Sequence, residues 1–279
     1  MKPLNEVSHY RVLVIGDAIY DHYRFCDTLG RGTKDSIMSV KFLNEETYQG
    51  GVWASAAHLA DLVDRVDIWH GSDAAVNIKY LGPYKQKLFS VHESKMVDGS
   101  VTPPDLTIYD LVIVFDYGMG FLTRDLRERI MNESEWLAVN AQSNSTNYGF
   151  NRVNEKWPRA DFCVVDELEA RLAAHEQDAP LEEVIAKLPY PRTIVTRGAH
   201  GSVGYHEGVF VKEEALTDRP IDLLGAGDAV LAVVAPFARA GWAMADLVHL
   251  GNVAGMIKVS ILGHQTRITK AELEKHLCA

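Results

Sequence analysis

Two short runs of apolar residues constrain the fold of this chain most. Residues 11–15 read RVLVI and residues 111–115 read LVIVF, and an aspartate follows each run within two residues. A strand that is apolar at every position is buried on both faces, which is typical of a parallel sheet covered by helices. Weaker strand patterns lie at 66–70, 136–139, 162–165 and 193–196, and helical patterns lie at 52–63, 123–130, 168–174, 181–188, 229–240 and 247–259. This alternation predicts an α/β fold with a mostly parallel central sheet flanked by helices.

Two segments interrupt the alternation of strands and helices. Residues 24–48 and 78–93 show strand-like patterns with no helical stretch inside them. We interpret them as a small, mainly antiparallel, lid-like β element that covers about residues 22–50 and 78–93. Unpaired edge strands are often covered by a partner, so the element favours a homodimer. No linker divides residues 1–279, so one domain is expected, with a long polar loop at 140–154.

The composition excludes two classes of partner. The 279 residues carry a formal net charge of -10, and no run of Lys and Arg is dense enough for a nucleic-acid interface. No apolar stretch is long enough to span a membrane, and the first residues lack the apolar core of a signal peptide. Cys26, Cys163 and Cys278 form neither a CxxC pair nor a zinc spacing. We therefore expect a cytoplasmic protein whose three thiols are reduced.

The most informative motif is DLLGAGD, which runs from Asp222 to Asp228 immediately before an apolar helix. The small residues Gly225, Ala226 and Gly227 let backbone N–H groups approach an anion, and a helix N-terminus favours negative charge. Asp228 would then stand beside the anion, where it could accept a proton from an attacking hydroxyl. A capped helix after a tight turn, with an aspartate at the first helical position, explains the local string equally well.

A second glycine-containing turn follows the strand pattern at 193–196. Thr196, Arg197, Gly198 and Gly201 lie where open α/β sheets bind ligands, at the carboxyl end of a strand. A simple hairpin turn into residues 202–205 explains the same residues, and the local string alone favours it.

Weaker signals occur early in the chain. Asp17 and Asp21 follow the first strand, and Gly50 and Gly51 precede a helix, where carboxylates and exposed backbone could bind a sugar. Four signatures are absent from the sequence: the P-loop, the dinucleotide GxGxxG after the first strand, GxSxG and HExxH. His58, on an apolar helix, is expected to be a satisfied core histidine rather than a ligand.

Taken in order, these segments resemble the ribokinase-like (PfkB) carbohydrate kinases. They look most like the kinase module of bacterial heptose-phosphate kinases, which phosphorylate D-glycero-D-manno-heptose 7-phosphate on the anomeric hydroxyl. Five segments carry the resemblance: VLVIGDAIYDHY (12–23), QGGVWASAAHLADL (49–62), FDYGMGFLT (115–123), IVTRGAHGSVGY (194–205) and DLLGAGDAVLAVV (222–234). The tail at 251–273 resembles the closing helices of the family. The resemblance implies a ribokinase-like fold and an ATP-dependent sugar kinase.

The resemblance also implies roles for single residues. Asp228 resembles the catalytic base, and Gly225, Ala226 and Gly227 resemble the anion hole for the transferring phosphoryl group. The positions that match nucleotide contacts are Thr196, Arg197, Gly198, Gly201, Asn252 and, within the adenine wall at 261–264, Gly263. The positions that match the sugar site are Asp17, Asp21, Gly50, Gly51 and Asp116. Asp166 and Glu169 match a site associated with Mg²⁺ and its waters, and Asp222 with late carbonyls matches a monovalent cation site for K⁺.

The sequence departs from the family mainly on the sugar side. Leu223 and Leu224 replace hydroxyl residues, Asp166 replaces an asparagine, an asparagine is missing near Ala54, and the segment at 73–78 is short. Met119 and the segment at 140–142 each stand where the family has a lysine, so two positive charges are lost. The sequence therefore leaves two alternatives for the acceptor. Either it is a sugar without a phosphate, or Arg31, Lys34 or Arg152 supplies the positive charge that a phosphate needs.

Three hypotheses follow from the sequence. The leading one is an ATP- and Mg²⁺-dependent kinase for a heptose or heptose phosphate. The second is a catalytically altered protein that binds sugar or nucleotide and partners a nucleotidyltransferase, which the altered sugar-side motifs motivate. The third is a nucleoside or pyridoxal-type kinase of the same fold, which the opening segment at 12–23 makes less favoured.

Overall fold

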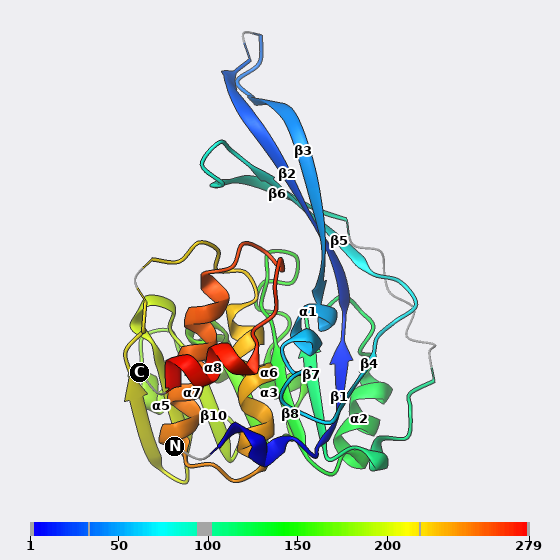
Figure 1. Ribbon diagram of the computed structural model, residues 1–279, viewed down its shortest axis with the longest axis vertical. Helices are drawn as coiled ribbons and strands as arrows, with labels where there is room; N and C mark the ends of the chain where they lie inside the picture. Colours follow the sequence, from blue (N-terminus) through cyan, green and yellow to red (C-terminus); the bar gives the residue numbers. More distant parts are fainter. Residues whose placement is uncertain (1–2, 33, 94–101, 218, 278–279) are drawn as a thin grey trace.

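A computed structural model describes residues 3–32, 34–93, 102–217 and 219–277 (Figure 1). Within these ranges the main sheet has eight strands in the order β12-β11-β10-β9-β8-β7-β1-β4. Its parallel strands are β1 (Arg11–Gly16), β4 (Arg65–Trp69), β7 (Leu111–Asp116), β8 (Leu137–Ala141), β9 (Phe162–Asp166) and β10 (Arg192–Thr196). At one edge, β11 (Ser202–His206) and β12 (Val209–Glu213) run antiparallel. The predicted mostly parallel sheet is confirmed.

A second sheet projects from the main body and forms the upper part of Figure 1. This lid sheet contains β2 (Ala18–Arg31), β3 (Met38–Gly51), β5 (Ala75–Leu81) and β6 (Lys87–Glu93) in the order β3-β2-β5-β6. The β2–β3 and β5–β6 pairs are antiparallel, and β2 and β5 pair in parallel. The predicted antiparallel element is confirmed, but its strands are longer, because β2 begins at Ala18, only two residues after β1 ends.

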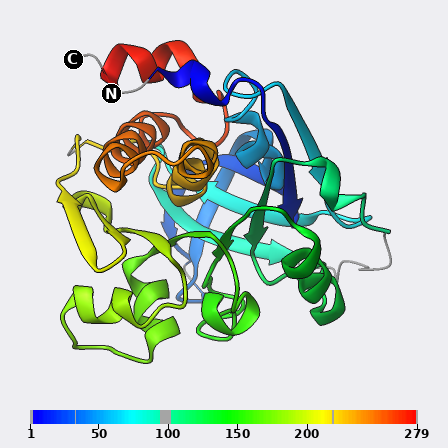
Figure 2. The ribbon, with the colours of Figure 1, turned by 90° about the horizontal axis from the view of Figure 1, so that it is seen from below.

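Helices cover both faces of the main sheet, as Figure 2 shows. One face carries α1 (Val52–Ala57), α6 (Ala226–Arg239) and α7 (Met244–Val259), with η1 (Leu4–Val7) and α8 (Lys270–Leu277) outside them. The other face carries η2 (Leu106–Ile108), α2 (Arg124–Glu133), α3 (Val153–Lys156), α4 (Glu167–Ala174) and α5 (Leu181–Ala186). The short η3 (Gly198–His200) follows β10. Thr123 caps α2 as predicted, accepting a hydrogen bond from the Leu126 N–H group.

The helix predicted at 52–63 is shorter than expected. It ends at Ala57, and residues 58–63 continue in tight turns with hydrogen bonds between residues three apart. This spacing keeps both Leu59 and Leu62 in the core, because side chains three residues apart point the same way in such turns. The apolar pattern is thus satisfied without a regular α-helix.

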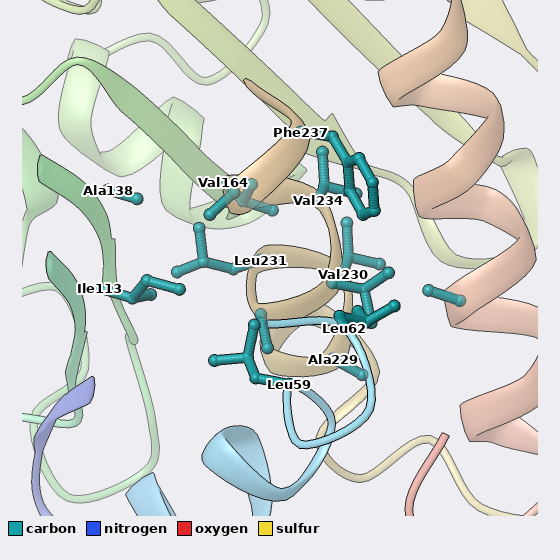
Figure 3. Close-up of a cluster of buried hydrophobic side chains, with 14 of the residues drawn as sticks. Leu59, Leu62, Ile113, Ala138, Val164, Ala229, Val230, Leu231, Val234 and Phe237 are labelled. Carbon is teal, nitrogen blue, oxygen red and sulfur yellow. The ribbon is translucent and has the colours of Figure 1, made fainter. Parts of the chain in front are cut away.

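The core explains why α6 is fixed against the sheet. Figure 3 shows Leu231 and Val234 of α6 among side chains from the strands, including Ile113 and Val164. All four are fully buried, and burying a side chain of this size contributes about 1.5–3 kcal/mol to stability. The buried helix holds its N-terminus, Gly225 to Asp228, at a defined place beside the sheet.

The remaining general expectations concern cysteines and membranes. The thiols of Cys26 and Cys163 are free and buried, and Cys278 lies outside the described residues. Among the described helices, none combines the length and the hydropathy that crossing a membrane requires.

Candidate active site

A cavity of about 450 Å³ lies at the carboxyl ends of β8, β9 and β10, next to the N-terminus of α6. Parallel strands all end at the same edge of a sheet, and this edge is where open α/β sheets bind ligands. The main cavity brings together ten residues that the sequence singles out: Asp166, Glu169, Thr196, Gly198, Gly201, Gly225, Ala226, Gly227, Asp228 and Asn252. Residues up to 86 positions apart, Asp166 and Asn252, therefore lie in one site.

The loop at Gly225 turns the chain into α6. Gly225 is the N-cap with φ of 70°, a conformation that residues with a Cβ atom rarely adopt. Asp228 is the third helical residue and not the first, and it is partly buried in the cavity wall. Burial raises the pKa of Asp228, although Tyr117, His264 and Lys258 act in the opposite direction. A carboxylate with a raised pKa is a stronger base than an ordinary aspartate, so Asp228 can accept a proton.

The turn after β10 is the hairpin turn that the local sequence favoured, and it lies beside the main cavity. β10 and β11 form an antiparallel hairpin around it, and the Arg197 N–H group donates to the Gly201 carbonyl over 2.8 Å. Thr196, Gly198 and Gly201 nevertheless line the main cavity. The Arg197 side chain is not part of that lining, and its Nε atom lies 3.0 Å from Glu167.

Asp166 and Glu169 cap α4 and face the same cavity. The Glu169 N–H group donates to Asp166 Oδ1 over 2.7 Å, and the Asp166 N–H group donates to Glu169 Oε2 over 2.9 Å. Burial and the adjacent Asp166 raise the pKa of Glu169 to about 8. A dication nearby would favour the ionised form of both carboxyls, so this pair fits a Mg²⁺ ion held through water. Direct coordination has less support, because the described residues contain no cluster of three His, Cys, Asp or Glu side chains suited to a metal.

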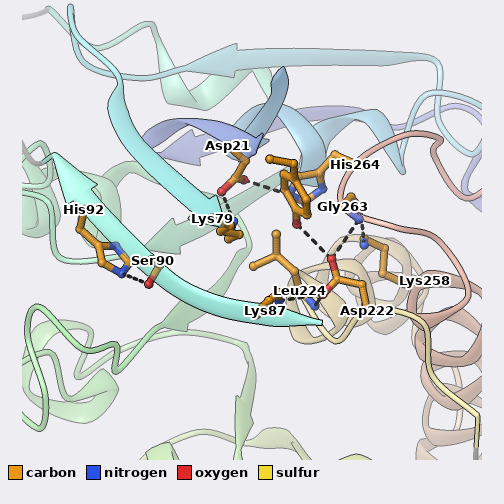
Figure 4. Close-up of polar contacts among 11 residues, drawn as sticks. Asp21, Lys79, Lys87, Ser90, His92, Asp222, Leu224, Lys258, Gly263 and His264 are labelled. Carbon is orange, nitrogen blue, oxygen red and sulfur yellow. Dashed lines mark hydrogen bonds and ion pairs between the residues drawn. The ribbon is translucent and has the colours of Figure 1, made fainter. Parts of the chain in front are cut away.

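Asp222 is a buried hub of hydrogen bonds (Figure 4). Its Oδ1 atom accepts from the Lys87 ammonium at 2.9 Å and the Leu224 N–H group at 3.1 Å. Its Oδ2 atom accepts from the Tyr23 hydroxyl and the Gly263 N–H group, both at 3.0 Å. Although burial alone would raise it, Lys87 and the two N–H groups lower the pKa of Asp222 to about 2. Four donors fill the carboxylate, so Asp222 does not fit the predicted monovalent cation ligand.

Gly263 also lies elsewhere than expected. It is not among the residues that line the main cavity, and it packs against Tyr23 while bonded to Asp222 and Lys258. Gly263, which matched the adenine wall, therefore belongs to the hydrogen-bond network around Asp222.

The sugar-side residues form a second group, at the junction of β1 with the lid sheet. Asp17 Oδ2 accepts hydrogen bonds from the N–H groups of Tyr117 (3.1 Å) and Met119 (3.3 Å). Its Oδ1 atom is buried without a hydrogen-bond partner among the described residues. Burial and the nearby Asp116 raise the pKa of Asp17 to about 7. Gly51 has φ of 59°, and a Cβ atom there would overlap the Asp17 carbonyl oxygen.

Asp21 is the second carboxylate of this group, and it lies against Gly50. It forms a buried ion pair with Lys79, and its Oδ2 atom is 3.4 Å from Nε2 of His264. Although burial alone would raise it, His264 and Lys79 hold the pKa of Asp21 below its ordinary value. A buried carboxylate held by a lysine and a histidine is fixed in place.

Asp116 has a structural use that the sequence did not reveal. Its Oδ2 atom accepts from the Trp157 indole N–H at 2.9 Å, and its Oδ1 atom accepts from Gly118 N–H and the Asn151 amide. It thereby anchors the predicted polar loop, which is shorter than expected: residues 142–152 form turns and loops, whereas 140–141 end β8 and 153–154 begin α3. It is not in the lining of the main cavity.

The positive charges at the site come from residues that sequence reasoning missed. Lys79 and Lys258 are buried, Lys87 is half exposed, and all three lie within the network of Asp21 and Asp222 in Figure 4. Burial lowers the pKa of both Lys79 and Lys258. One signal was available, because Lys258 is the only Asp, Glu, Lys or Arg between Leu247 and Val259.

The three cations proposed from the sequence lie elsewhere. Arg31 and Lys34 are exposed at the tip of the β2–β3 hairpin, and Arg152 pairs with Glu155 at 3.0 Å. His264, expected at the adenine wall, instead contacts Asp21. His58 is a satisfied core histidine as predicted: its Nδ1 atom accepts from the Ile268 N–H group, and burial lowers its pKa to about 3.

Solved structures with the same arrangement define the class of fold. Ribokinase from Thermotoga maritima superposes with a TM-score of 0.75 at 12% identity, covering 97% of this chain and 100% of that one. Arabidopsis thaliana ribokinase, complexed with ribose and ATP, superposes with a TM-score of 0.73 at 16% identity, covering 96% and 99% of the two chains. The predicted ribokinase-like fold is confirmed.

Sequence comparison gives the family. The model of the pfkB family carbohydrate kinases matches residues 114–271, more than half of the chain. The chain belongs to the PfkB family and is a carbohydrate kinase.

Two curated relatives are similar to it at low identity. The bifunctional protein HldE of Hydrogenovibrio crunogenus is 24% identical over 317 residues, covering 99% of this chain and 64% of that protein. The D-beta-D-heptose 7-phosphate kinase of Bordetella bronchiseptica is 24% identical over 314 residues, covering 97% of each chain. The chain thus spans less than two thirds of the bifunctional relative.

Proposed function

We propose that this kinase transfers the γ-phosphoryl group of ATP to a hydroxyl of a heptose or heptose phosphate. The observation that carries the proposal is Asp228, a carboxyl with raised pKa directly after the glycine loop in the wall of the main cavity. The name of the relative from B. bronchiseptica supports the class of sugar. Residues 1–279 are interpreted as one kinase domain.

In the proposed reaction, the γ-phosphate lies against the backbone N–H groups of Gly225, Ala226 and Gly227 at the start of α6. The acceptor hydroxyl gives its proton to the Asp228 carboxylate while its oxygen attacks phosphorus. The bond from phosphorus to the oxygen of the β-phosphate breaks, and ADP leaves with the electron pair. Catalysis of this kind depends on positioning and charge stabilisation, which a fixed loop and a fixed carboxylate supply.

The rest of ATP is assigned to the remaining lining of the cavity. Thr196, Gly198 and Gly201 would contact phosphates, and Asn252 would contact the nucleoside. Asn252 is held in place because its Oδ1 atom accepts from the Ser202 hydroxyl at 2.8 Å and its amide donates to the Glu214 carbonyl at 3.2 Å. Asp166 and Glu169 would hold Mg²⁺ through water. When bound, that ion supplies positive charge against the phosphate oxygens.

The acceptor is assigned to the group around Asp17 and Asp21. The unpartnered Oδ1 atom of Asp17 is suited to accept a hydrogen bond from a sugar hydroxyl, because leaving a buried carboxylate oxygen unpaired is costly. Lys87, which pairs with Asp222, and His264, which contacts Asp21, are the side chains that a phosphate on the acceptor would contact. The loss of the two family lysines is therefore compatible with a phosphorylated acceptor.

A second candidate function is sugar or nucleotide binding without turnover, in partnership with a nucleotidyltransferase. One observation favours it: Met119 and Leu223 depart from the pattern of the family. The two candidates predict different results for ATP consumption.

The test measures ATP-dependent phosphorylation of heptoses, heptose phosphates and hexose phosphates. We expect Asp228→Asn to lower kcat on the accepted sugar by roughly 10²–10⁴-fold, the usual contribution of a general base. Asp125→Asn is the matched control, because Asp125 is also in the first turn of a helix but is exposed on α2, and kcat should stay within about twofold. The proposal fails if no acceptor is phosphorylated. Ligand binding by calorimetry without turnover would then favour the second candidate.

A further inference from the structure

The place where the family pattern implies a monovalent cation is filled by the protein's own donors. Asp222 and a late carbonyl are the ligands that the pattern implies. The four hydrogen bonds described above use both oxygens of Asp222. One carbonyl late in the chain, that of Gly263, accepts a hydrogen bond from the Lys258 ammonium at 2.8 Å. An incoming cation would find its oxygen ligands occupied and two ammonium groups nearby.

Lys258 is unusually placed for a lysine. Its side chain is fully buried on α7, where desolvation is costly unless carboxylates and hydrogen bonds compensate. Asp222, Asp228 and Asp21 all act on it electrostatically, and Gly263 accepts its hydrogen bond. Its Cε atom would lie 3.6 Å from a Cβ atom built on Gly225. The ammonium therefore sits behind the anion-binding loop, close to the carboxylate at each end of the DLLGAGD motif.

We propose that the ammonium of Lys258, assisted by Lys87, takes the structural and electrostatic place of a monovalent cation, so that this kinase does not depend on K⁺. Lys258 is a positioning residue: it fixes the segment at 222–228 against the segment after α7. Lys87 reaches Asp222 from β6, which ties the same loop to the lid sheet. The catalytic consequence rests on the proposed phosphoryl transfer, but the occupancy of the cation place does not.

The first test therefore uses no acceptor. We compare the Tm of the wild type in KCl and in choline chloride at equal ionic strength, where an ion at about 100 times its Kd would raise Tm by roughly 5 °C or more. We expect equal values in the two salts. A selective gain in KCl overturns the proposal. Crystals soaked in Tl⁺, which mimics K⁺ and scatters strongly, give a second reading of the wild type: density between Asp222 and Gly263 overturns the proposal, and its absence supports it.

The second test asks whether K⁺ can replace the ammonium. In Lys258→Ala we expect a lower Tm in choline chloride and a selective recovery in KCl, because the lost side chain leaves room beside the Gly263 carbonyl. Lys212→Ala is the control, since Lys212 is an exposed lysine on β12 that pairs with Glu182 and does not contact Asp222, and its Tm should not depend on the choice of salt. An equal loss in both salts would show that Lys258 acts by packing alone and overturn the proposal. If Lys258→Ala does not fold, the wild-type measurements decide.

Failure of this inference and failure of the proposed function give different results. Phosphorylation that proceeds equally in KCl and choline chloride supports both. Phosphorylation that needs K⁺ keeps the function and overturns the inference. Salt-independent stability without phosphorylation of any acceptor overturns the function and keeps the occupancy of the cation place.

Discussion

The Nε2 atom of His264 lies 3.4 Å from the Oδ2 atom of Asp21, so the segment after α7 and the first strand of the lid sheet meet at one carboxylate. The same ring lies close to the glycine loop before α6, because a Cβ atom on Gly225 would be 3.1 Å from its Cε1 atom. His264 therefore connects the sugar-side group to the start of α6. A substitution of His264 should therefore change the KM for the acceptor more than the KM for ATP.

We expect His264→Asn to raise the KM for the acceptor by about tenfold or more, since a hydrogen bond to a charged group contributes about 1.5–3 kcal/mol. The KM for ATP should change by less than about twofold, because His264 is not part of the main cavity. Steady-state kinetics with each substrate varied in turn separates the two. His175→Asn is the control: His175 is exposed with φ of 54°, which asparagine tolerates. Equal changes in both KM values would contradict this role.

Lys79→Met should destabilise the protein by about 3–5 kcal/mol, because it leaves the buried Asp21 carboxylate without its closest cation. Adding Asp21→Asn should recover part of this loss, since the uncompensated charge is then removed. Urea unfolding of the two single variants and the double variant measures the free energies of unfolding. Independent, additive losses would mean that the ion pair is not the cause.

The raised pKa of Asp17 predicts a pH dependence of stability. The folded protein holds a proton on this carboxyl up to a pKa of about 7, whereas the unfolded chain releases it near the ordinary aspartate pKa of 3.8. The contribution is fully present below pH 3.8 and is lost as the pH rises through 7, about 2–3 kcal/mol between pH 5 and pH 8. Asp17→Asn should flatten the free energy of unfolding over this range. An unchanged slope in the variant would exclude Asp17 as its source.

Gly51→Ala should destabilise the fold more than Gly208→Ala. Both glycines have positive φ, 59° and 82°, so both variants carry backbone strain of about 1–3 kcal/mol, and Gly51 has in addition a ψ of -134°, outside the left-handed helical region. A Cβ atom on Gly51 would also overlap the Asp17 carbonyl oxygen, whereas one on Gly208 meets open space. We therefore expect about 1–3 kcal/mol more loss at Gly51. Similar losses in thermal or urea unfolding would show that the contact with Asp17 relaxes easily.

The main sheet was predictable because its signal is local. A run such as RVLVI indicates by itself that both faces of the strand are buried. The helices between such runs leave few folds other than a parallel sheet covered by helices. The bounds of the lid strands were not predictable, because the pairing of β2 with β3 and β5 decides where β2 begins. The local sequence around Ala18 does not indicate which strands pair with β2.

The candidate site divides in the same way. The glycine loop and the turn after β10 have local signatures and lie together in the cavity. Lys79 and Lys87 have no local signature, because their partners Asp21 and Asp222 are 58 and 135 residues away along the chain. Residue type alone also does not show which aspartate is available to a ligand. Asp116 and Asp222 match the family pattern as well as Asp228 does, yet their oxygens accept hydrogen bonds from the protein itself.

The exposed face of the lid hairpin supports the predicted homodimer. Leu29, Ile37, Phe42 and Leu43 are between 51% and 63% exposed on or beside β2 and β3. Apolar side chains exposed on a projecting hairpin are groups that a second copy could cover. We expect sedimentation equilibrium to give about twice the 31.0 kDa of one chain, and Phe42→Lys with Leu43→Lys to return it to 31.0 kDa. Val209→Lys, at an equally exposed position on β12, should leave the mass unchanged. A single 31.0 kDa species of the wild type at working concentration would exclude the dimer.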